Sequence, residues 1–248
     1  MDFDREQLFR NVHSWLSGYD PKPRDGRDPV IFRGGGAHPI HNGVIRTVDA
    51  DLDQAIEQAR EYLAGVAWLW WSGDDSRPGL AEELLARGAR DAGGMPVMAV
   101  RIDDVTAPEF PPELLVEEVA GRRALREWVE AYAEPMGVPA EKVGDALETE
   151  RNRSDAEGSY RRFVGRVDGR VVSTSAVLTH DDTAGVYVVA TAEPFQRRGY
   201  GTAMTAAALR AARRDGATVG TLQASAAGEP VYERMGFRTV AGYRLLTI

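Results

Sequence analysis

Residues 186–201 read VYVVATAEPFQRRGYG and join a strand pattern to a glycine-containing loop that leads into a helix. The apolar and β-branched residues at the start favour a strand, and the small, apolar residues 202–212 favour a helix. Gly199 and Gly201 let backbone N–H groups approach a bound anion without obstruction by a Cβ atom. The start of the helix adds a partial positive charge and unpaired donors. This segment therefore predicts a cradle for a pyrophosphate.

Two common phosphate-binding motifs do not fit this loop. A P-loop requires Gly-Lys-Ser/Thr, but Lys22 and Lys142 are the only lysines of the chain. A dinucleotide fingerprint requires a third glycine three residues after Gly201, and that position is Met204. The predicted cradle is therefore of another kind.

The loop resembles the acetyl-CoA loop of the GNAT N-acetyltransferase superfamily, whose signature is Gln/Arg-x-x-Gly-x-Gly/Ala. Six residues match it in order: Gln196, Arg197, Arg198, Gly199, Tyr200 and Gly201. A second landmark of the superfamily, a strand and a short helix ending in Tyr-x-x-x-Gly-Phe, is matched by Tyr232, Gly236 and Phe237. Ser225 departs from the pattern, because many members have Asn seven positions before the Tyr. The resemblance covers residues 114–248 as a fold and 186–238 residue by residue.

The resemblance implies acetyl-CoA as the donor co-substrate and no metal. It implies that the donor is bound by residues of the strand end, the loop, the first helical turn and the following strand: Val189, Ala190, Thr191, Gln196, Arg197, Arg198, Gly199, Tyr200, Gly201, Thr202 and Ser225. The backbone of the first three would contact the pantetheine and the acetyl carbonyl. Tyr232 would be the catalytic general acid for the CoA thiolate, since a phenol with a pKa of about 10 is protonated at pH 7. The alternative is that Tyr232 only packs on the sheet.

The general base is left open by the sequence. The strand before the loop has no carboxylate, although many relatives of the superfamily have a Glu there. The segments that usually form the acceptor cleft contain four candidates, Glu134, Glu148, Glu150 and Glu157. Tyr187 and His180 are no better supported.

Residues 107–112 contain three prolines and predict the boundary between two domains, because proline blocks both helix continuation and strand pairing. We expect the domains to be residues 1–106 and 113–248. In the second domain, the sequence pattern predicts a strand at 114–119, helices at 121–132 and 140–151, and three strands at 160–191. Alternating helices and strands are predicted after them. We therefore expect an α+β, GNAT-like fold with a mixed, mostly antiparallel twisted sheet flanked by helices.

The first half resembles a degenerate repeat of the second. Strand 43–47, helix 51–63, strand 66–71 and helix 77–87 align with the core of the second half, with Leu84 opposite Tyr232. The loop at residues 47–52 is acidic and has no glycine, so it would repel a pyrophosphate. We expect a degenerate GNAT-like N-terminal α/β domain that is non-catalytic and binds no CoA.

Composition excludes several classes of function. The chain has 30 Lys+Arg against 38 Asp+Glu, a net charge of −8, which argues against a surface for nucleic acid or anionic lipid. It has no Cys, which excludes a thiol-based acetyl-enzyme. The longest apolar stretch, residues 66–71, is too short to span a membrane, and the acidic start lacks a signal-peptide pattern. We expect a cytoplasmic protein and leave homodimer formation open.

These patterns favour an acetyl-CoA-dependent N-acetyltransferase that transfers the acetyl group directly to a primary amine of a small molecule or peptide in a ternary complex. The alternative is a non-catalytic acyl-CoA-binding regulatory module, since the missing strand carboxylate and Ser225 are compatible with lost catalysis. His38 and His41 suggest a metal pair, but Pro39 breaks helical spacing between them, so we expect no metal site there.

Overall fold

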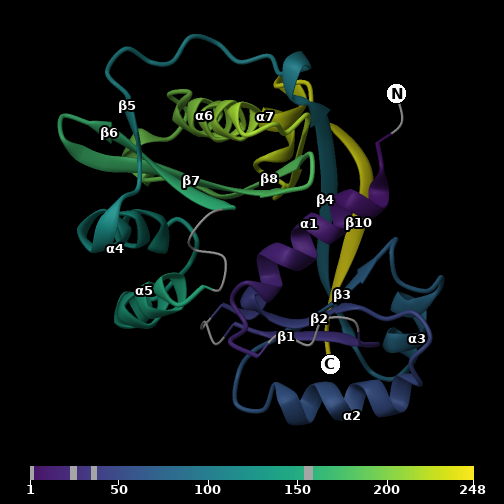
Figure 1. Ribbon diagram of the computed structural model, residues 1–248. Coiled ribbons are helices and arrows are strands. Elements are labelled where there is room, and N and C mark those ends of the chain that lie inside the picture. The colour runs from purple at the N-terminus through teal and green to yellow at the C-terminus, as the bar shows by residue number, and fades with distance from the viewer. Residues whose placement is uncertain (1–2, 23–26, 35–37, 154–158) are drawn as a thin grey trace.

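The computed structural model describes residues 3–22, 27–34, 38–153 and 159–248. In this part of the chain the strands form one 10-stranded sheet with the order β1-β2-β3-β10-β4-β9-β8-β7-β6-β5 (Figure 1). The pairs β2–β3 and β8–β9 are parallel, and the others are antiparallel. The strands are β1 (Val30–Arg33), β2 (Asn42–Arg46), β3 (Leu69–Gly73), β4 (Arg90–Arg101), β5 (Leu115–Glu118), β6 (Tyr160–Val167), β7 (Arg170–His180), β8 (Thr183–Thr191), β9 (Val219–Gln223) and β10 (Arg238–Thr247).

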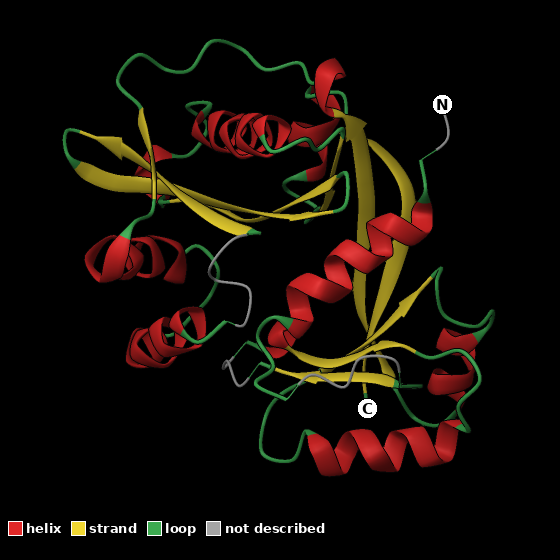
Figure 2. Ribbon diagram, viewed as in Figure 1, coloured by secondary structure: helices red, strands yellow, loops and turns green. Residues whose placement is uncertain are grey.

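Helices cover both faces of this sheet (Figure 2). In the C-terminal half, α6 (Tyr200–Arg214) and α7 (Glu229–Arg234) lie on one face, and α4 (Gly121–Ala133) and α5 (Val143–Arg151) lie on the other. In the N-terminal half, α2 (Leu52–Tyr62) and α3 (Leu80–Ala86) cover the outer face, and α1 (Arg5–Ser17) lies between the halves. The fold is the predicted α+β, GNAT-like fold, preceded by the predicted degenerate half.

Helix α1 is fixed on the strands of the second half by a buried asparagine. Asn11 Nδ2 donates to the carbonyl oxygens of Leu178 (3.1 Å) and Thr183 (3.0 Å), and the Tyr187 hydroxyl donates to Asn11 Oδ1 (2.7 Å). A Cβ atom on Gly185 would collide with the same Oδ1, so this approach requires glycine. The first helix of the chain is thereby bound to β7 and β8.

The two halves have the same order of elements and exchange one strand. The series β2-α2-β3-α3-β4 is repeated as β8-α6-β9-α7-β10. Strand β4 of the first half lies between β9 and β10, whereas β10 of the second half lies between β3 and β4 (Figure 1). Each half therefore supplies one strand to the sheet of the other. The division at residues 107–112 stays a prediction, since one continuous sheet joins the halves.

Three element boundaries of the first half differ from the prediction. Strand β3 begins at Leu69 instead of residue 66, and α3 begins at Leu80 instead of residue 77. The sequence pattern predicts a strand at residues 95–102, but β4 already begins at Arg90. The early residues of β4 include Gly93 and Gly94, which give no strand pattern, but they pair with Leu245 and Arg244 of β10. Pairing with a distant strand, and not local preference, sets the length of β4.

The exchange predicts that the two halves remain together after the connection between them is cut. A protease site inserted between Pro108 and Glu109 allows cleavage in the folded state. We expect the two fragments to co-elute in size-exclusion chromatography and to separate only in denaturant, because β4 and β10 are each paired with strands of the other half. Fragments that separate in native buffer would contradict the exchange.

Candidate active site

Strands β8 and β9 are paired only near their beginnings. The parallel ladder joins Thr183–Gly185 to Val219–Thr221 and then ends. Beyond it, residues 186–191 of β8 have no partner on β9, so the backbone on this side of β8 is open to a ligand. Three of the predicted binding residues, Val189, Ala190 and Thr191, are the last residues of this open segment.

A β-bulge lies in the open segment. Ala190 faces Thr174 of β7 and Tyr187 faces Ala176, so three steps along β8 oppose two along β7. Val188 lies in the bulge with φ of 51°, a conformation that a β-branched residue rarely adopts. Hydroxyls of β7 hold it: Thr174 Oγ1 donates to the Val188 carbonyl (2.9 Å) and Ser173 Oγ to the Ala190 carbonyl (2.7 Å). No local sequence pattern predicts this bulge.

The loop after β8 ends in the left-handed Gly199, which has φ of 83° and begins α6 without a side-chain cap. The first N–H groups of α6 therefore have no partner from a capping side chain. Gln196 Nε2 donates to the Thr191 carbonyl (3.1 Å) and ties the loop back to β8. A Cβ atom on Gly201 would point toward Val189 Cγ1 and Thr191 Oγ1, each 3.9 Å away. Position 201 therefore faces the space between α6 and the open end of β8, where a phosphate chain would lie.

Arginines surround this loop. Arg197 is exposed, and Arg198 Nη2 donates to the Pro194 carbonyl (3.1 Å) while its guanidinium lies 5.4 Å from the Phe195 ring centre. The Arg170 guanidinium lies 6.0 Å from the same ring. A chain with a net charge of −8 therefore places three cations at the predicted phosphate site.

Tyr232 lies close to this cradle through Thr205 of α6. Burial raises the pKa of Tyr232 to about 12, although a hydrogen bond with Thr205 lowers it. Thr205 Oγ1 also donates to the Gly201 carbonyl (2.9 Å), so one hydroxyl joins the predicted acid to the predicted phosphate loop. The Tyr232 ring packs edge-on against Phe237, with the ring centres 5.8 Å apart and an angle of 62° between the ring planes.

Three other predicted residues differ in what they can offer a ligand. The Tyr200 side chain is buried, and its hydroxyl donates to Glu113 Oε1 (2.7 Å), so only its backbone faces the cradle. Ser225 Oγ accepts from the backbone N–H of Gly228 (3.2 Å), which leaves its O–H free to donate. Thr202 is half-buried in the first turn of α6.

Glu150, one candidate for the general base, is committed elsewhere. Its carboxylate is buried and accepts from the Tyr19 hydroxyl (2.7 Å) and from Arg162 Nε (3.0 Å) and Nη2 (2.8 Å). When one partner of such a buried ion pair loses its charge, the other charge is left buried and unpaired, which strongly destabilises the folded protein. Glu150 therefore joins α5 to β6 and to Tyr19, which follows α1, and both of its carboxylate oxygens are engaged in these contacts.

The structure does not single out any of the other candidates for the general base. Glu148 forms an ion pair with Arg151, Glu134 is exposed at the end of α4, and Glu157 lies outside the described residues. His180 is paired with Asp181 (3.3 Å). Tyr187 precedes the bulge, but burial raises its pKa well above the ordinary value, so it keeps its proton.

The first half repeats the geometry of β8 and β9. Its parallel ladder joins Gly43 and Val44 of β2 to Leu69 and Trp70 of β3 and then ends. The register between β1 and β2 shifts so that Ile45 is an extra residue on β2. An opening and a bulge therefore occur at the matching place in both halves.

The opening in the first half is closed by the connection between β3 and α3. Ser76 Oγ accepts from the Thr47 N–H (3.2 Å), and the Arg77 N–H donates to the Thr47 carbonyl (2.9 Å). Arg46 Nε donates to the Asp75 carbonyl (3.3 Å). These bonds fill the space that corresponds to the opening beside β8.

A carboxylate of the chain itself occupies the loop before α2. The Asp28 side chain accepts from the backbone N–H groups of Val48 (2.9 Å), Asp49 (2.5 Å) and Ala50 (2.7 Å). Burial raises the pKa of Asp28, but these three N–H donors outweigh it and hold the pKa below the ordinary value. The donors that would face a pyrophosphate in this half are thus already used, a contact between residues 20 positions apart that the sequence did not reveal.

A groove of about 950 Å³ lies away from the predicted site, where α1, the ends of β2 and β3 and the tip of the β7–β8 hairpin meet. It contains a His13–Asp75 pair, with Nε2 and Oδ2 2.9 Å apart. Neither this groove nor any other place in the described ranges contains a group of three or more His, Cys, Asp or Glu placed to hold a metal ion. No helix in those ranges is long and apolar enough to cross a membrane.

Replacing Asp28 tests whether its charge fills the loop before α2. We expect Asp28→Ala to lower the free energy of unfolding by about 1–2 kcal/mol, because three N–H groups lose their acceptor. Since the pKa is lowered in the folded state, the charge stabilises the protein above the unfolded pKa of about 3.9 and this stabilisation is lost as the pH falls further.

Urea unfolding of the wild type and of Asp28→Asn from pH 7 to pH 3 measures this effect. The difference in stability should be full at pH 7 and shrink below about pH 4. A difference that does not change with pH would exclude a role for the Asp28 charge.

Comparison with known proteins agrees with this geometry. Residues 132–244 match the family model of the acetyltransferase (GNAT) domain. No curated protein matches the chain.

Solved structures match nearly the whole chain. A GCN5-related N-acetyltransferase from Kribbella flavida is 23% identical, with a TM-score of 0.69, over 96% of this chain and 94% of that one. A functionally unknown conserved protein from Staphylococcus epidermidis is 13% identical, with a TM-score of 0.67, over 92% and 94%.

A tandem GNAT protein from the clavulanic acid biosynthesis pathway is 13% identical, with a TM-score of 0.57, over 79% of this chain and 68% of that one. At these identities the likeness shows the fold. Together with the match of residues 132–244 to the acetyltransferase (GNAT) domain, it shows that the chain resembles the GNAT superfamily, most directly in its second half.

Proposed function

We propose that the protein is an acetyl-CoA-dependent N-acetyltransferase that moves the acetyl group directly to a primary amine in a ternary complex. The observation that carries this proposal is the open, bulged end of β8 beside the glycine-bounded start of α6. Tyr232 lies at the same place, joined to the cradle through Thr205. The parts needed to hold a phosphorylated donor and to stabilise developing charge are therefore together.

Acetyl-CoA would supply the thioester and the acetyl group. Residues 196–202 would hold its phosphates through backbone N–H groups and arginines, and residues 189–191 would orient the pantetheine and the acetyl carbonyl. A backbone donor to a developing oxyanion is worth about 3 kcal/mol of barrier. The chain has no Cys, which supports direct attack by the amine over a thiol-based acetyl-enzyme.

Tyr232 would hold a proton near the departing sulfur. With a pKa of about 12, its phenol is protonated throughout the neutral range. It is a weaker acid than a free tyrosine, whose pKa is about 10. Its main contribution would therefore be a hydrogen bond to the sulfur as negative charge develops there.

The acceptor would be an amine of a small molecule or a peptide. An overall negative charge attracts cationic amines, which supports such an acceptor over nucleic acid or a membrane surface. We further propose a cytoplasmic location and a single donor site per chain, in the second half. The filled loop of the first half supports the last point.

A non-catalytic acyl-CoA-binding regulatory module is the second candidate. It is favoured by the engaged state of Glu150 and by Ser225 in place of the usual Asn. Thioester turnover measured over a library of amines separates the two candidates. Donor binding without turnover on any amine would favour the regulatory module.

The cradle can be tested by a charge placed at Gly201. Gly201→Glu would direct a carboxylate toward Val189 and Thr191, and we expect it to abolish acetyl-CoA binding measured by calorimetry. Gly144→Glu is the matched control, because this helical glycine in α5 has open space around its Cβ position. The control should bind as the wild type does; equal binding by both variants would contradict the position of the cradle.

Removing the Tyr232 hydroxyl tests its proposed role. We expect Tyr232→Phe to lower kcat by about 10–100-fold with little change in acetyl-CoA affinity, because the hydroxyl acts on charge that develops during the reaction. Since the pKa of Tyr232 is about 12, its ionisation should produce no fall in the wild-type rate between pH 7 and pH 10. A parallel loss of affinity and rate in the variant would show that Tyr232 is a packing residue.

A further inference from the structure

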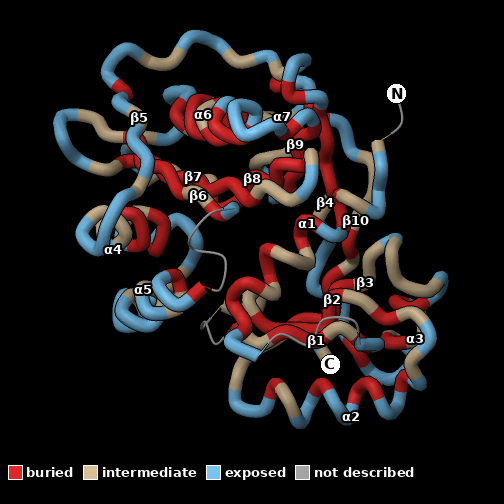
Figure 3. The backbone as a smooth tube through the Cα atoms, in the orientation of Figure 1, coloured by how far each residue is buried: buried red, intermediate tan, exposed pale blue. Residues whose placement is uncertain are grey.

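The segment between the two halves runs along the outer side of the second half (Figure 3). Residues 103–113 are exposed or half-buried, yet they contact both α6 and α7. The Thr106 N–H donates to the Met235 carbonyl at the end of α7 (3.0 Å). At the far end of α6, Arg213 Nη2 lies 2.7 Å from Asp103 Oδ1. The segment is thus attached to both helices that follow the open strands.

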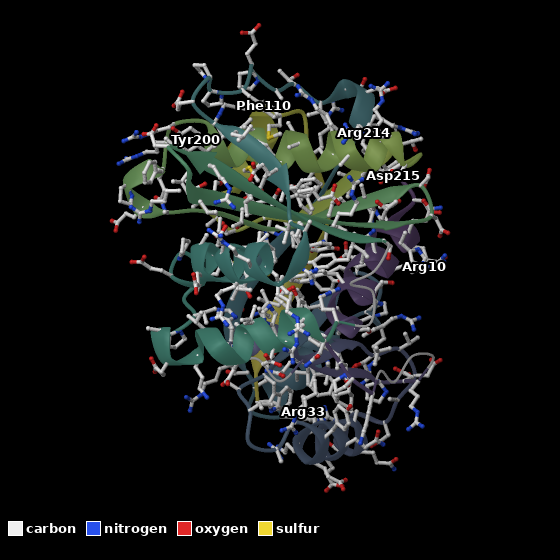
Figure 4. All side chains as sticks on the ribbon, turned by 60° about the vertical axis from the view of Figure 1, so that its left-hand side comes forward. Arg10, Arg33, Phe110, Tyr200, Arg214 and Asp215 are labelled. Carbon is white, nitrogen blue, oxygen red and sulfur yellow. The ribbon has the colours of Figure 1, made fainter. Side chains whose placement is uncertain are left out.

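Further along, the same segment reaches the start of α6. The Arg210 guanidinium lies 4.6 Å from the centre of the Phe110 ring, and Pro111 Cγ is 3.8 Å from the position that a Cβ on Gly199 would occupy. Figure 4 shows Phe110 and Tyr200 on the same part of the molecule. The connection therefore lies directly against the residue at which the phosphate loop turns into the helix.

At its C-terminal end, the connecting segment forms a side-chain hydrogen bond with the first residue of α6. The Tyr200 hydroxyl donates to Glu113 Oε1 (2.7 Å), and this bond lowers the pKa of Glu113 and keeps it charged. The Tyr200 ring is buried among Leu114, Val172 and Ala203, with Phe110 and Phe195 packed around them. Phe195 lies at the beginning of the phosphate loop and Tyr200 directly follows Gly199, so this cluster holds both ends of the loop.

We propose that Tyr200 and Glu113 are positioning residues for the pyrophosphate of the donor. They would act through the backbone: the Glu113–Tyr200 bond fixes the first residue of α6, and with it the N–H groups next to Gly199. This inference rests on the proposed function, because it assumes a donor with a pyrophosphate in the cradle. It assigns the connection between the halves to the donor site.

Two donors test the proposal: acetyl-CoA, and S-acetylpantetheine, which has the same thioester and pantetheine but lacks the pyrophosphate and the 3′-phosphoadenosine. Tyr200→Phe removes the hydroxyl and keeps the buried ring. We expect it to weaken acetyl-CoA binding about fivefold to tenfold, through loss of one hydrogen bond to a charged group. Binding of S-acetylpantetheine, which has no pyrophosphate, should be unchanged, whereas a general loss of structure would weaken both.

Glu113 provides an independent variant, and Tyr19 a matched control. Glu113→Ala should weaken acetyl-CoA binding as Tyr200→Phe does, Glu113→Gln should weaken it less because it keeps an acceptor oxygen, and the double variant Tyr200→Phe/Glu113→Ala should lose no more than either alone. Tyr19→Phe removes a similar Tyr–Glu bond of 2.7 Å far from the loop and should leave donor binding unchanged.

The outcomes separate this inference from the proposed function. Unchanged acetyl-CoA binding in both Tyr200→Phe and Glu113→Ala, or equal loss of acetyl-CoA and S-acetylpantetheine binding, would overturn the positioning role and leave the proposed function standing. Failure of the wild type to bind acetyl-CoA would overturn both.

Discussion

The antiparallel pairing of β4 with β10 is the constraint on which the rest of this structure depends. The two strands pair from Arg90 with Thr247 to Ala99 with Arg238, at the centre of the sheet. Each is the last strand of its own half, and each also pairs with a strand of the other half, β4 with β9 and β10 with β3. Neither half can complete its sheet alone, so the first half is part of the framework of the second.

The two halves share a framework but differ in the loop that leads into the first helix after the bulged strand, which is α6 in the second half and α2 in the first. Both have a parallel strand pair that opens and a bulge on the strand before the loop. In the second half, the left-handed Gly199 begins α6 and no side chain caps the helix. In the first, Asp28 takes the N–H groups, and Ser76 and Arg77 close the gap between the strands. A few local contacts, and not the fold, separate an open site from a closed one.

The sequence predicted the parts of this picture that depend on local patterns. The helix predicted at residues 51–63 is present as α2, which Asp51 caps, and Gly199 gives the expected loop before α6, because caps and glycines act over a few residues. The strand exchange could not be predicted, since Gly93 and Gly94 take strand form only against β10. Asp28 and Glu113 were missed for a related reason: each acts on a segment at least 20 residues away, and no local pattern marks such a partner.

We propose that only the second half offers a donor site, although both halves have the same framework. Calorimetric titration of the intact wild-type chain with acetyl-CoA counts the donor sites. We expect saturation at one equivalent of acetyl-CoA per chain. Saturation at two equivalents would show that the first half also binds the donor and would contradict the closure by Asp28.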